Sequence, residues 1–199
     1  MSRRYEKRKR KVQEEQTRER IVAATSALHE EVGPARTTVT AIAERAGVAR
    51  PTVYQHFPDD KALFGACAAH FSERNPPPDP GEWARIKDPV ERLKTALERT
   101  YGYYAATERM TANVVRDAPL LPALRSVLEE DEGPYVEEVM RVLLSGWGVR
   151  GKRRAKLAAL LTLAVDFLTW QRLVSDGGLT GAEAADVMVG AASRIAGGS

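Results

Sequence analysis

The sequence predicts an all-α protein built from two helical domains, and three observations predict it. Apolar residues recur at spacings of three and four in most segments, which places them on one face of a helix. Proline and glycine clusters separate these segments, most clearly in residues 75–81. No segment alternates apolar and polar residues as a half-buried strand does. With 199 residues, 43% of them hydrophobic, the chain can form a small N-terminal domain and a larger helical core.

Residues 1–16 are predicted to form a basic flexible arm ahead of the first helix. Within residues 3–11, seven Lys or Arg surround one Glu, and such a run repels itself too strongly to fold alone. The first helix is expected to begin near Thr17 and to stop at Gly33-Pro34. Its inner apolar stripe consists of Ile21, Ala24, Thr25, Leu28 and Val32.

Residues 37–63 predict two short helices joined by a tight turn. Ile42, Ala43 and Ala46 share one face of the first helix, and Gly47 supplies the left-handed conformation that ends it. Pro51 suits the first turn of the second helix, which buries Val53 and Phe57. Such a helix–turn–helix unit usually places its second helix in the major groove of DNA. The alternative is an ordinary pair of packed helices with a solvated polar face.

Residues 17–71 also resemble the N-terminal domain of TetR-type transcriptional regulators. The motifs that carry this resemblance are Thr38 with Ile42-Ala43, Ala46-Gly47-Val48, Thr52-Val53-Tyr54 with His56-Phe57, and Lys61 with Leu63. The resemblance implies a DNA-binding domain over residues 17–75, with phosphate contacts from Thr38, Tyr54, His56 and Lys61. It implies that the residues facing bases are Arg50, Pro51, Thr52 and Gln55.

Two departures from the family pattern affect this interface. Ala49 and Pro51 stand where the family often has Ser and Gly, and Ala cannot cap a helix with a side-chain oxygen. The pair Asp59-Asp60 can cap the fourth helix but repels phosphate, which makes the phosphate contact of Lys61 less certain than that of Tyr54.

The positive charge of the chain is concentrated at its N-terminal end. The first 75 residues carry 14 Lys or Arg against 10 Asp or Glu, and the remainder carries 16 against 17. The arm is expected to contact DNA along phosphates or in the minor groove, through Arg3, Arg4, Arg8 and Arg10. The alternative is a tail that only increases solubility.

Residues 76–199 are predicted to form a helical effector-binding and dimerisation domain. The fourth helix begins near Asp60 and ends before the proline cluster, which is predicted to be an extended connection. Further helices are expected over residues 89–106, a shorter segment through Val115, and residues 124–145, 152–176 and 180–196.

Aromatic and soft side chains in this second domain predict a site for a small-molecule effector. The candidate residues are Tyr101, Tyr104, Met110, Trp147, Asp166, Phe167 and Trp170. Asp166 lies in an apolar run, so it is expected to meet an Arg, to cap a polar network or to face a cavity. The hypothesis is that an apolar or cationic molecule binds here and shifts a dimer away from its DNA spacing. The alternative is that each aromatic residue only fills the core.

Residues 155–173 are apolar nearly all round, which predicts burial from two sides. One side is expected to face its own domain and the other a second subunit, with the small residues of the last helix allowing close approach. The resemblance implies a four-helix dimer interface that includes Leu157, Leu161, Leu168, Ala185, Val189 and Ala192. The alternative is a core within one chain. A dimer would read a palindromic site.

The sequence argues against an enzyme and against a membrane protein. The three histidines lack metal-ligand spacing, and no nucleotide-binding or nucleophile motif is present, so no cofactor or metal is expected. Cys67 is the only cysteine, which fits a reducing cytoplasm and a packing role. No apolar run approaches a membrane span, and the charged start does not resemble a signal peptide.

The expected function is a cytoplasmic homodimeric regulator that binds double-stranded DNA, with repression released by a small molecule. One alternative is an architectural DNA-binding dimer without an effector. Another is a small helical enzyme or scaffold whose arm binds RNA or an acidic protein.

Overall fold

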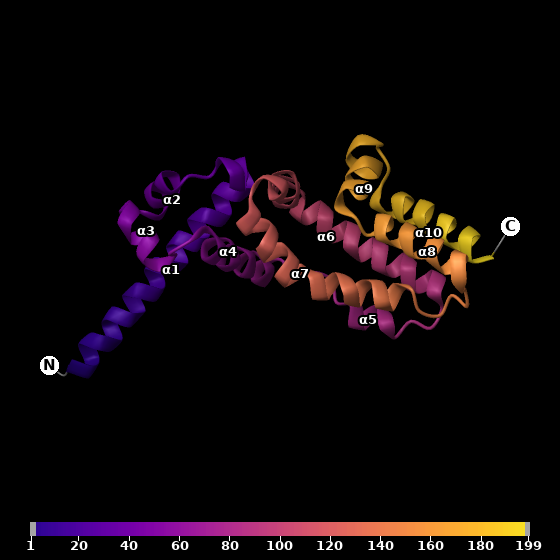
Figure 1. Cartoon of the computed structure of the whole chain (residues 1–199), viewed down its shortest axis with the longest axis horizontal. Helices are drawn as coiled ribbons and strands as arrows, with labels where there is room; N and C mark the ends of the chain where they lie inside the picture. The colour runs from indigo at the N-terminus through magenta and orange to yellow at the C-terminus, as the bar shows by residue number, and fades with distance from the viewer. Residues whose placement is uncertain (1–2, 198–199) are drawn as a thin grey trace. The chain divides into compact units, whose positions relative to one another are not determined.

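The computed structural model describes residues 3–197, and the side chains of residues 5–197. Every regular element in this range is helical (Figure 1). Contacts divide the chain into two units. Unit 1 contains the residues up to Pro76 together with Arg109–Glu129, and unit 2 contains Pro77–Glu108 together with the residues from Glu130 onward.

Helices α6 and α7 each contribute to both units. Unit 1 contains α1 (Arg3–Val32), α2 (Val39–Ala46), α3 (Arg50–His56), α4 (Asp60–Arg74), the end of α6 (Pro89–Asp117) and the start of α7 (Pro122–Leu143). Unit 2 contains α5 (Pro80–Ala84), the rest of α6 and α7, α8 (Gly151–Ala164), α9 (Phe167–Gln171) and α10 (Gly181–Gly197). Single helical turns cover Pro34–Arg36, Ala118–Leu120 and Arg172–Asp176.

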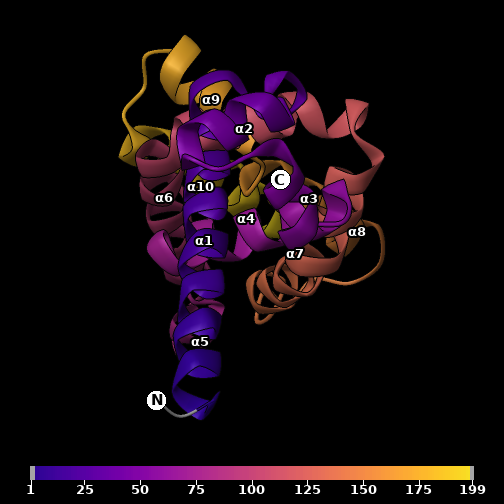
Figure 2. The same cartoon turned by 90° about the vertical axis from the view of Figure 1, so that its left-hand side faces the viewer.

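Helix α1 begins at Arg3, so the segment expected to be a flexible arm is helical in the structure. The first half of α1 projects beyond α2, α3 and α4 (Figures 1 and 2). Lys, Arg, Glu and Gln have high helix propensity, and residues 3–32 contain neither Pro nor Gly. An ion pair one turn apart, from Arg10 Nε to Glu14 Oε1 at 3.0 Å, also supports the helix.

The core of unit 1 lies between α1 and the two short helices that follow it. Ile21 and Leu28 of α1 are buried together with Ile42 and Ala43 of α2 and Val53 of α3. A second cluster joins Phe64 of α4 to Leu124 and Val127 of α7. The predicted inner stripes of α2 and α3 are therefore the buried ones, and so is that of α1 except for Val32, which is 39% exposed.

Two helices in the second half of the chain differ from the sequence prediction. Helix α6 runs without a break through the expected gap after residue 106, because its interior contains no proline and its only glycine, Gly102, is tolerated. The predicted helix over residues 152–176 is broken at Val165–Asp166, where Asp166 caps a new helix. The segments Gly151–Ala164 and Phe167–Asp176 are bent by 66° to each other.

Within unit 2, α8 and α10 lie side by side along the bundle (Figure 1). The proline cluster is not extended throughout, because Asp79 accepts a hydrogen bond from Gly81 N (2.8 Å) and caps the short helix α5. Trp83 anchors α5 with 1% of its surface exposed. Within the described residues, no single helix is long and apolar enough to cross a membrane; α8 and Phe167–Asp176 reach that length and composition only as a bent pair.

Candidate functional site

The turn between α2 and α3 is held by backbone geometry that the sequence predicted. The Thr38 side chain caps α2 by accepting a hydrogen bond from Ala41 N at 3.1 Å. Gly47 has φ +64° and ψ 43°, the left-handed conformation. The next N–H, that of Val48, donates to Ala43 O at 3.0 Å, which closes the end of the helix. The relative direction of α2 and α3 is therefore set by local bonds.

One face of α3 is buried and the opposite face is open. Val53 and Phe57 are 2% and 4% exposed, and the guanidinium of Arg18 lies 5.2 Å from the centroid of the Phe57 ring. On the other side, a shallow hollow is lined by Arg50, Pro51, Tyr54 and Gln55. Tyr54 is 51% exposed. The open face thus presents a guanidinium, a phenol hydroxyl and an amide together.

The other predicted DNA contacts have different degrees of exposure around this face. Thr38 and Lys61 are exposed, and Thr52 and His56 are half-buried. Helix α3 follows Ala49 and has no side-chain cap, as the sequence predicted. Asp59 caps α4 by accepting from Ala62 N at 2.7 Å, which confirms the cap expected just before Lys61.

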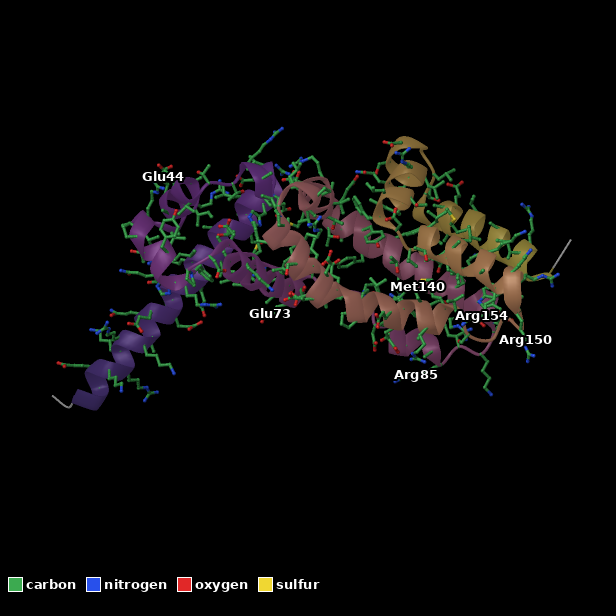
Figure 3. All side chains as sticks on the ribbon, viewed as in Figure 1. Glu44, Glu73, Arg85, Met140, Arg150 and Arg154 are labelled. Atoms are coloured by element: carbon green, nitrogen blue, oxygen red, sulfur yellow. The ribbon has the colours of Figure 1, made fainter. Side chains whose placement is uncertain are left out.

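Long-range contacts that the sequence did not predict hold α2 against α1. Arg20 donates to Ala46 O (3.2 Å), and Arg45 makes two 2.7 Å bonds to the carboxylate of Glu31. This pairing lowers the pKa of Glu31 and raises that of Arg45. Glu44 points outward on α2, away from these contacts (Figure 3). No motif of the sequence pointed to these contacts, because the partners are 14 to 26 residues apart.

Hydrogen bonds from the end of α6 hold the segment between α1 and α2 in place. The buried carboxylate of Asp117 accepts a hydrogen bond from Ala35 N at 2.9 Å and pairs with Arg116. These contacts, the bond from Arg116 first, lower the pKa of Asp117. Asn113 donates to the carbonyls of His29 and Glu30 at the end of α1. Unit 1 therefore includes residues more than 80 positions away from the helices that they support.

The predicted basic contacts at the start of α1 are only partly described. Arg8 and Arg10 are exposed on the projecting half of the helix, and Arg10 is paired with Glu14. Arg3 and Arg4 are helical, but their side chains lie outside the described part.

Four of the predicted effector residues lie close together in unit 2. The Tyr104 ring is 5.4 Å from Phe167, edge to face, and 5.8 Å from Trp170, and Phe167 and Trp170 are 5.5 Å apart. The Tyr104 hydroxyl donates to Val165 O at 2.6 Å. Asp166 follows directly, but it is exposed rather than buried. Its carboxylate accepts from Thr169 N at 2.8 Å and so caps α9.

The other predicted effector residues have structural partners elsewhere. Tyr101 is 1% exposed, and its hydroxyl donates to Ala164 O at 2.8 Å. Trp147 donates from its indole N–H to Leu143 O at 2.7 Å. Met110 is buried within unit 1. Within residues 5–197, no group of three or more His, Cys, Asp or Glu side chains is arranged to hold a metal ion.

Five of the six predicted dimer residues are buried inside the single chain. These are Leu157, Leu161, Ala185, Val189 and Ala192, each at most 9% exposed. They lie on α8 and α10, which are in contact within the chain. The sequence could not distinguish such a contact from one between subunits. The large apolar side chains left open on α8, α9 and α10 are Leu163, Leu168 and Val187, at 56%, 46% and 51% exposed.

Comparison with known families identifies the N-terminal region. Residues 21–67 match a family described as bacterial regulatory proteins, tetR family. This segment contains α2, α3 and the caps described above. No curated protein matches the chain.

Comparison with solved structures extends the likeness to the whole chain. A TetR-like transcriptional regulator from Rhodococcus sp. RHA1 matches with a TM-score of 0.63 and 21% identity, covering 92% of this chain and 97% of that one. A tetR-family transcriptional regulator from Streptomyces coelicolor matches with a TM-score of 0.61 and 17% identity, covering 91% and 80%. NalD, the secondary repressor of the MexAB-OprM multidrug efflux pump in Pseudomonas aeruginosa, matches at 0.58 and 19%, covering 92% and 96%. At these identities the likeness is one of fold.

Proposed function

We propose that this chain, whose residues 21–67 match the tetR family of bacterial regulatory proteins, is a member of that family and represses transcription from a palindromic operator. The match of residues 21–67 to the tetR family and the fold shared with TetR-like regulators support a DNA-binding regulator. The finer proposal is a cytoplasmic homodimer that leaves its operator when a small molecule binds unit 2. The observation that carries the proposal is the open face of α3, backed by the buried Val53 and Phe57.

The side chains on that face suit base and phosphate contacts. Arg pairs bidentately with guanine, and Gln pairs with adenine. We propose that Arg50, Pro51, Thr52 and Gln55 face the bases, and that Tyr54, Thr38, His56 and Lys61 contact phosphates. The Thr38 oxygen that caps α2 retains its hydroxyl proton, which is free to be donated to a phosphate.

The projecting half of α1 supports a second contact with DNA. Exposed Arg8 and Arg10 lie on a helix that carries a strong excess of positive charge. Such charges increase affinity and its salt dependence rather than sequence discrimination. We therefore propose that this half of α1 lies along phosphates beside the site that α3 reads.

The direct test is selection of genomic fragments by the purified full-length protein at about physiological salt, where non-specific binding is weak. One enriched palindrome is the expected result. Enrichment without a shared motif would favour an architectural DNA-binding dimer, and absence of duplex binding would overturn the proposal. A reporter gene behind the enriched site distinguishes repression from activation.

A further inference from the structure

Positive charge is concentrated in unit 2 around the start of α8. Residues 139–165 contain six Lys or Arg and no Asp or Glu. Unit 2 as a whole contains 13 Lys or Arg against 15 Asp or Glu, so this concentration does not follow from a basic composition. Five of the six cations lie at the start of α8 and are called here the α8 basic surface: Arg150, Lys152, Arg153, Arg154 and Lys156.

These five cations are exposed and have no partner in the described part of the chain. Figure 3 labels two of them, Arg150 and Arg154, where α8 begins. None of the five side chains makes a hydrogen bond or an ion pair with any residue that the structure describes. By contrast, Lys94 of the same unit bonds to Asp186 at 2.7 Å. The charge of the α8 basic surface is therefore not compensated within residues 5–197.

This arrangement of charges destabilises the helix that carries it. Lys152 and Lys156 lie one helical turn apart, as do Arg153 and Lys156, and like charges at this spacing repel. The N-terminus of a helix also carries partial positive charge, and Arg150 occupies the capping position without a side-chain bond. Departures from local stability rules are expected at functional sites. A bound anion would relieve both the repulsion and the missing cap.

The surface continues onto a neighbouring loop, because a buried arginine ties two loops of unit 2 together. Arg92 donates to Ile86 O at 2.7 Å in the loop between α5 and α6, and to Ser145 O in the loop that leads into α8. A Cβ added to Gly146 would lie 3.8 Å from Lys87 O, which places the two loops in contact. Lys87 is exposed, so a further cation lies on this side of unit 2.

The composition of the surface indicates which polyanion it suits. Residues 146–161 contain no Asn, Gln, Ser or Thr, and contacts from cations to phosphates carry no sequence information. No large apolar side chain of residues 139–162 is among the exposed ones. The centre of a protein interface and the face of a membrane-bound helix both need such side chains. The regular phosphates of a nucleic acid duplex need only positive charge.

We propose that the α8 basic surface binds the phosphate backbone of duplex DNA without reading its sequence, separately from the face of α3. The choice of DNA rests on the proposed function, because unit 1 would hold the chain on DNA and give a second, weak surface a high effective concentration of duplex. The uncompensated charge itself does not rest on that function. The consequence is a share of DNA affinity that comes from unit 2 and depends strongly on salt.

The first test is lysine acetylation of the full-length protein at low salt, with and without a short duplex of random sequence, measured by mass spectrometry. Phosphate contacts are expected to slow the acetylation of Lys152 and Lys156 by about threefold or more. Lys94, already paired with Asp186 in the same unit, is the internal control and should react at an unchanged rate.

The second test compares two double variants of equal net charge. Arg153→Gln with Lys156→Gln removes two cations of the surface, and Arg99→Gln with Arg172→Gln removes two exposed cations elsewhere in unit 2. Each phosphate contact contributes about 0.9 to the slope of log affinity against log salt, so the surface variant should lower the slope by about 2. Between about 50 and 200 mM salt it should lose about tenfold less affinity than the wild type. The control variant should follow the wild type.

The outcomes separate this surface from the regulatory function. Unchanged acetylation of Lys152 and Lys156 on adding duplex, or equal salt slopes for the two double variants, would overturn the DNA contact. Protection of these lysines by phosphatidylserine vesicles or by polyglutamate, and not by duplex, would also overturn it and would assign the surface to a membrane or to an acidic protein. Protection by duplex in a protein that selects no palindrome would keep the surface and overturn the proposed function.

Discussion

Three side chains on the open face of α3 differ in what they can recognise. The Arg50 guanidinium and the Gln55 amide can form paired hydrogen bonds with base edges, whereas the Tyr54 hydroxyl offers a single bond suited to a phosphate. Arg50 and Tyr54 are at positions i and i+4 of α3, and Gln55 follows Tyr54 and lines the same hollow. Base contacts and phosphate contacts leave different signatures in binding data.

Arg50→Ala and Gln55→Ala are each expected to cost about 1–3 kcal/mol of operator binding and to relax preference at one base position. Tyr54→Phe is expected to weaken binding to all DNA sequences alike. Binding of single-base operator variants, measured by fluorescence anisotropy, checks both. Arg74→Ala removes an exposed charge from the end of α4 and is the control. If Arg50→Ala lowered the affinity for every operator variant equally, this result would contradict a base contact by Arg50.

His29 makes the stability of unit 1 depend on pH. It is 4% exposed, its Nδ1 lies 3.5 Å from the Cys67 thiol, and its ring is 5.6 Å from that of Phe64. Burial lowers the pKa of His29 to about 4, although the negative charge of Asp117 acts to raise it. The folded state therefore holds His29 neutral, and this contribution to stability is present above pH 6.5 and lost as the pH falls toward 4.

The expected loss is about 3 kcal/mol of unfolding free energy between pH 6.5 and 4. Urea unfolding of the wild type and of His29→Gln over this range measures it. The difference between the two proteins should change with pH, because only the wild type must protonate a buried imidazole. The same buried surroundings raise the pKa of Cys67 to about 11, so the thiol stays protonated throughout. A pH-independent difference would contradict this account.

At the scale of elements, the role of the glycine between α2 and α3 can be tested with two matched Gly→Ala variants. Gly47 has positive φ, whereas Gly65 lies inside α4, where an added Cβ would meet no atom within 4 Å. Gly47→Ala is expected to destabilise the domain by about 1–2 kcal/mol through left-handed strain. Gly65→Ala is expected to stabilise it by up to about 1 kcal/mol. Melting temperatures check both predictions. An unchanged melting temperature for Gly47→Ala would show that the turn can adopt another backbone conformation at no cost in stability.

The start of α8 carries charge of the wrong sign for a helix N-terminus. Arg150 occupies the capping position without a side-chain bond, and Lys152, Arg153 and Arg154 follow it. Arg150 and Arg154 lie at this end of unit 2 (Figure 3). A helix N-terminus favours negative charge and a side-chain acceptor.

Arg150→Asp is therefore expected to stabilise unit 2 by about 1 kcal/mol. Thermal unfolding measures the gain, with Arg99→Glu, at an exposed position in the interior of α6, as a control for the change of charge alone. A lower melting temperature for Arg150→Asp would indicate that the arginine makes a contact important to the assembled protein.

At the scale of the whole molecule, the proposed homodimer would need apolar surface that a single chain leaves open. The exposed side chains of Leu163, Leu168 and Val187 are available for such a contact, whereas the buried apolar residues of α8 and α10 are not. We expect the double variant Leu163→Glu, Val187→Glu to be monomeric in sedimentation and to lose operator affinity at least tenfold, because two half-sites are no longer bound together. Leu120→Glu, on exposed surface of unit 1, should remain dimeric. A dimeric double variant would place the interface elsewhere.

Sequence prediction succeeded where a few neighbouring residues decide the structure. Gly47 was predicted as the turn residue and the pair Asp59-Asp60 as the cap of the fourth helix, and Gly47 and Asp59 have those roles. The open face of α3 follows from the same local pattern. The support from Arg20, Arg45 and Asp117 was missed, because the partners of these residues lie far away in the chain.

The sequence by itself determined an all-helical chain with a TetR-type helix–turn–helix, because helical periodicity, caps and a left-handed glycine are local properties. Only the tertiary structure decided where α6 continues, where α8 breaks, and which apolar residues of α8 and α10 are buried. Burial and pairing depend on residues brought together from distant parts of the chain, which no local pattern records.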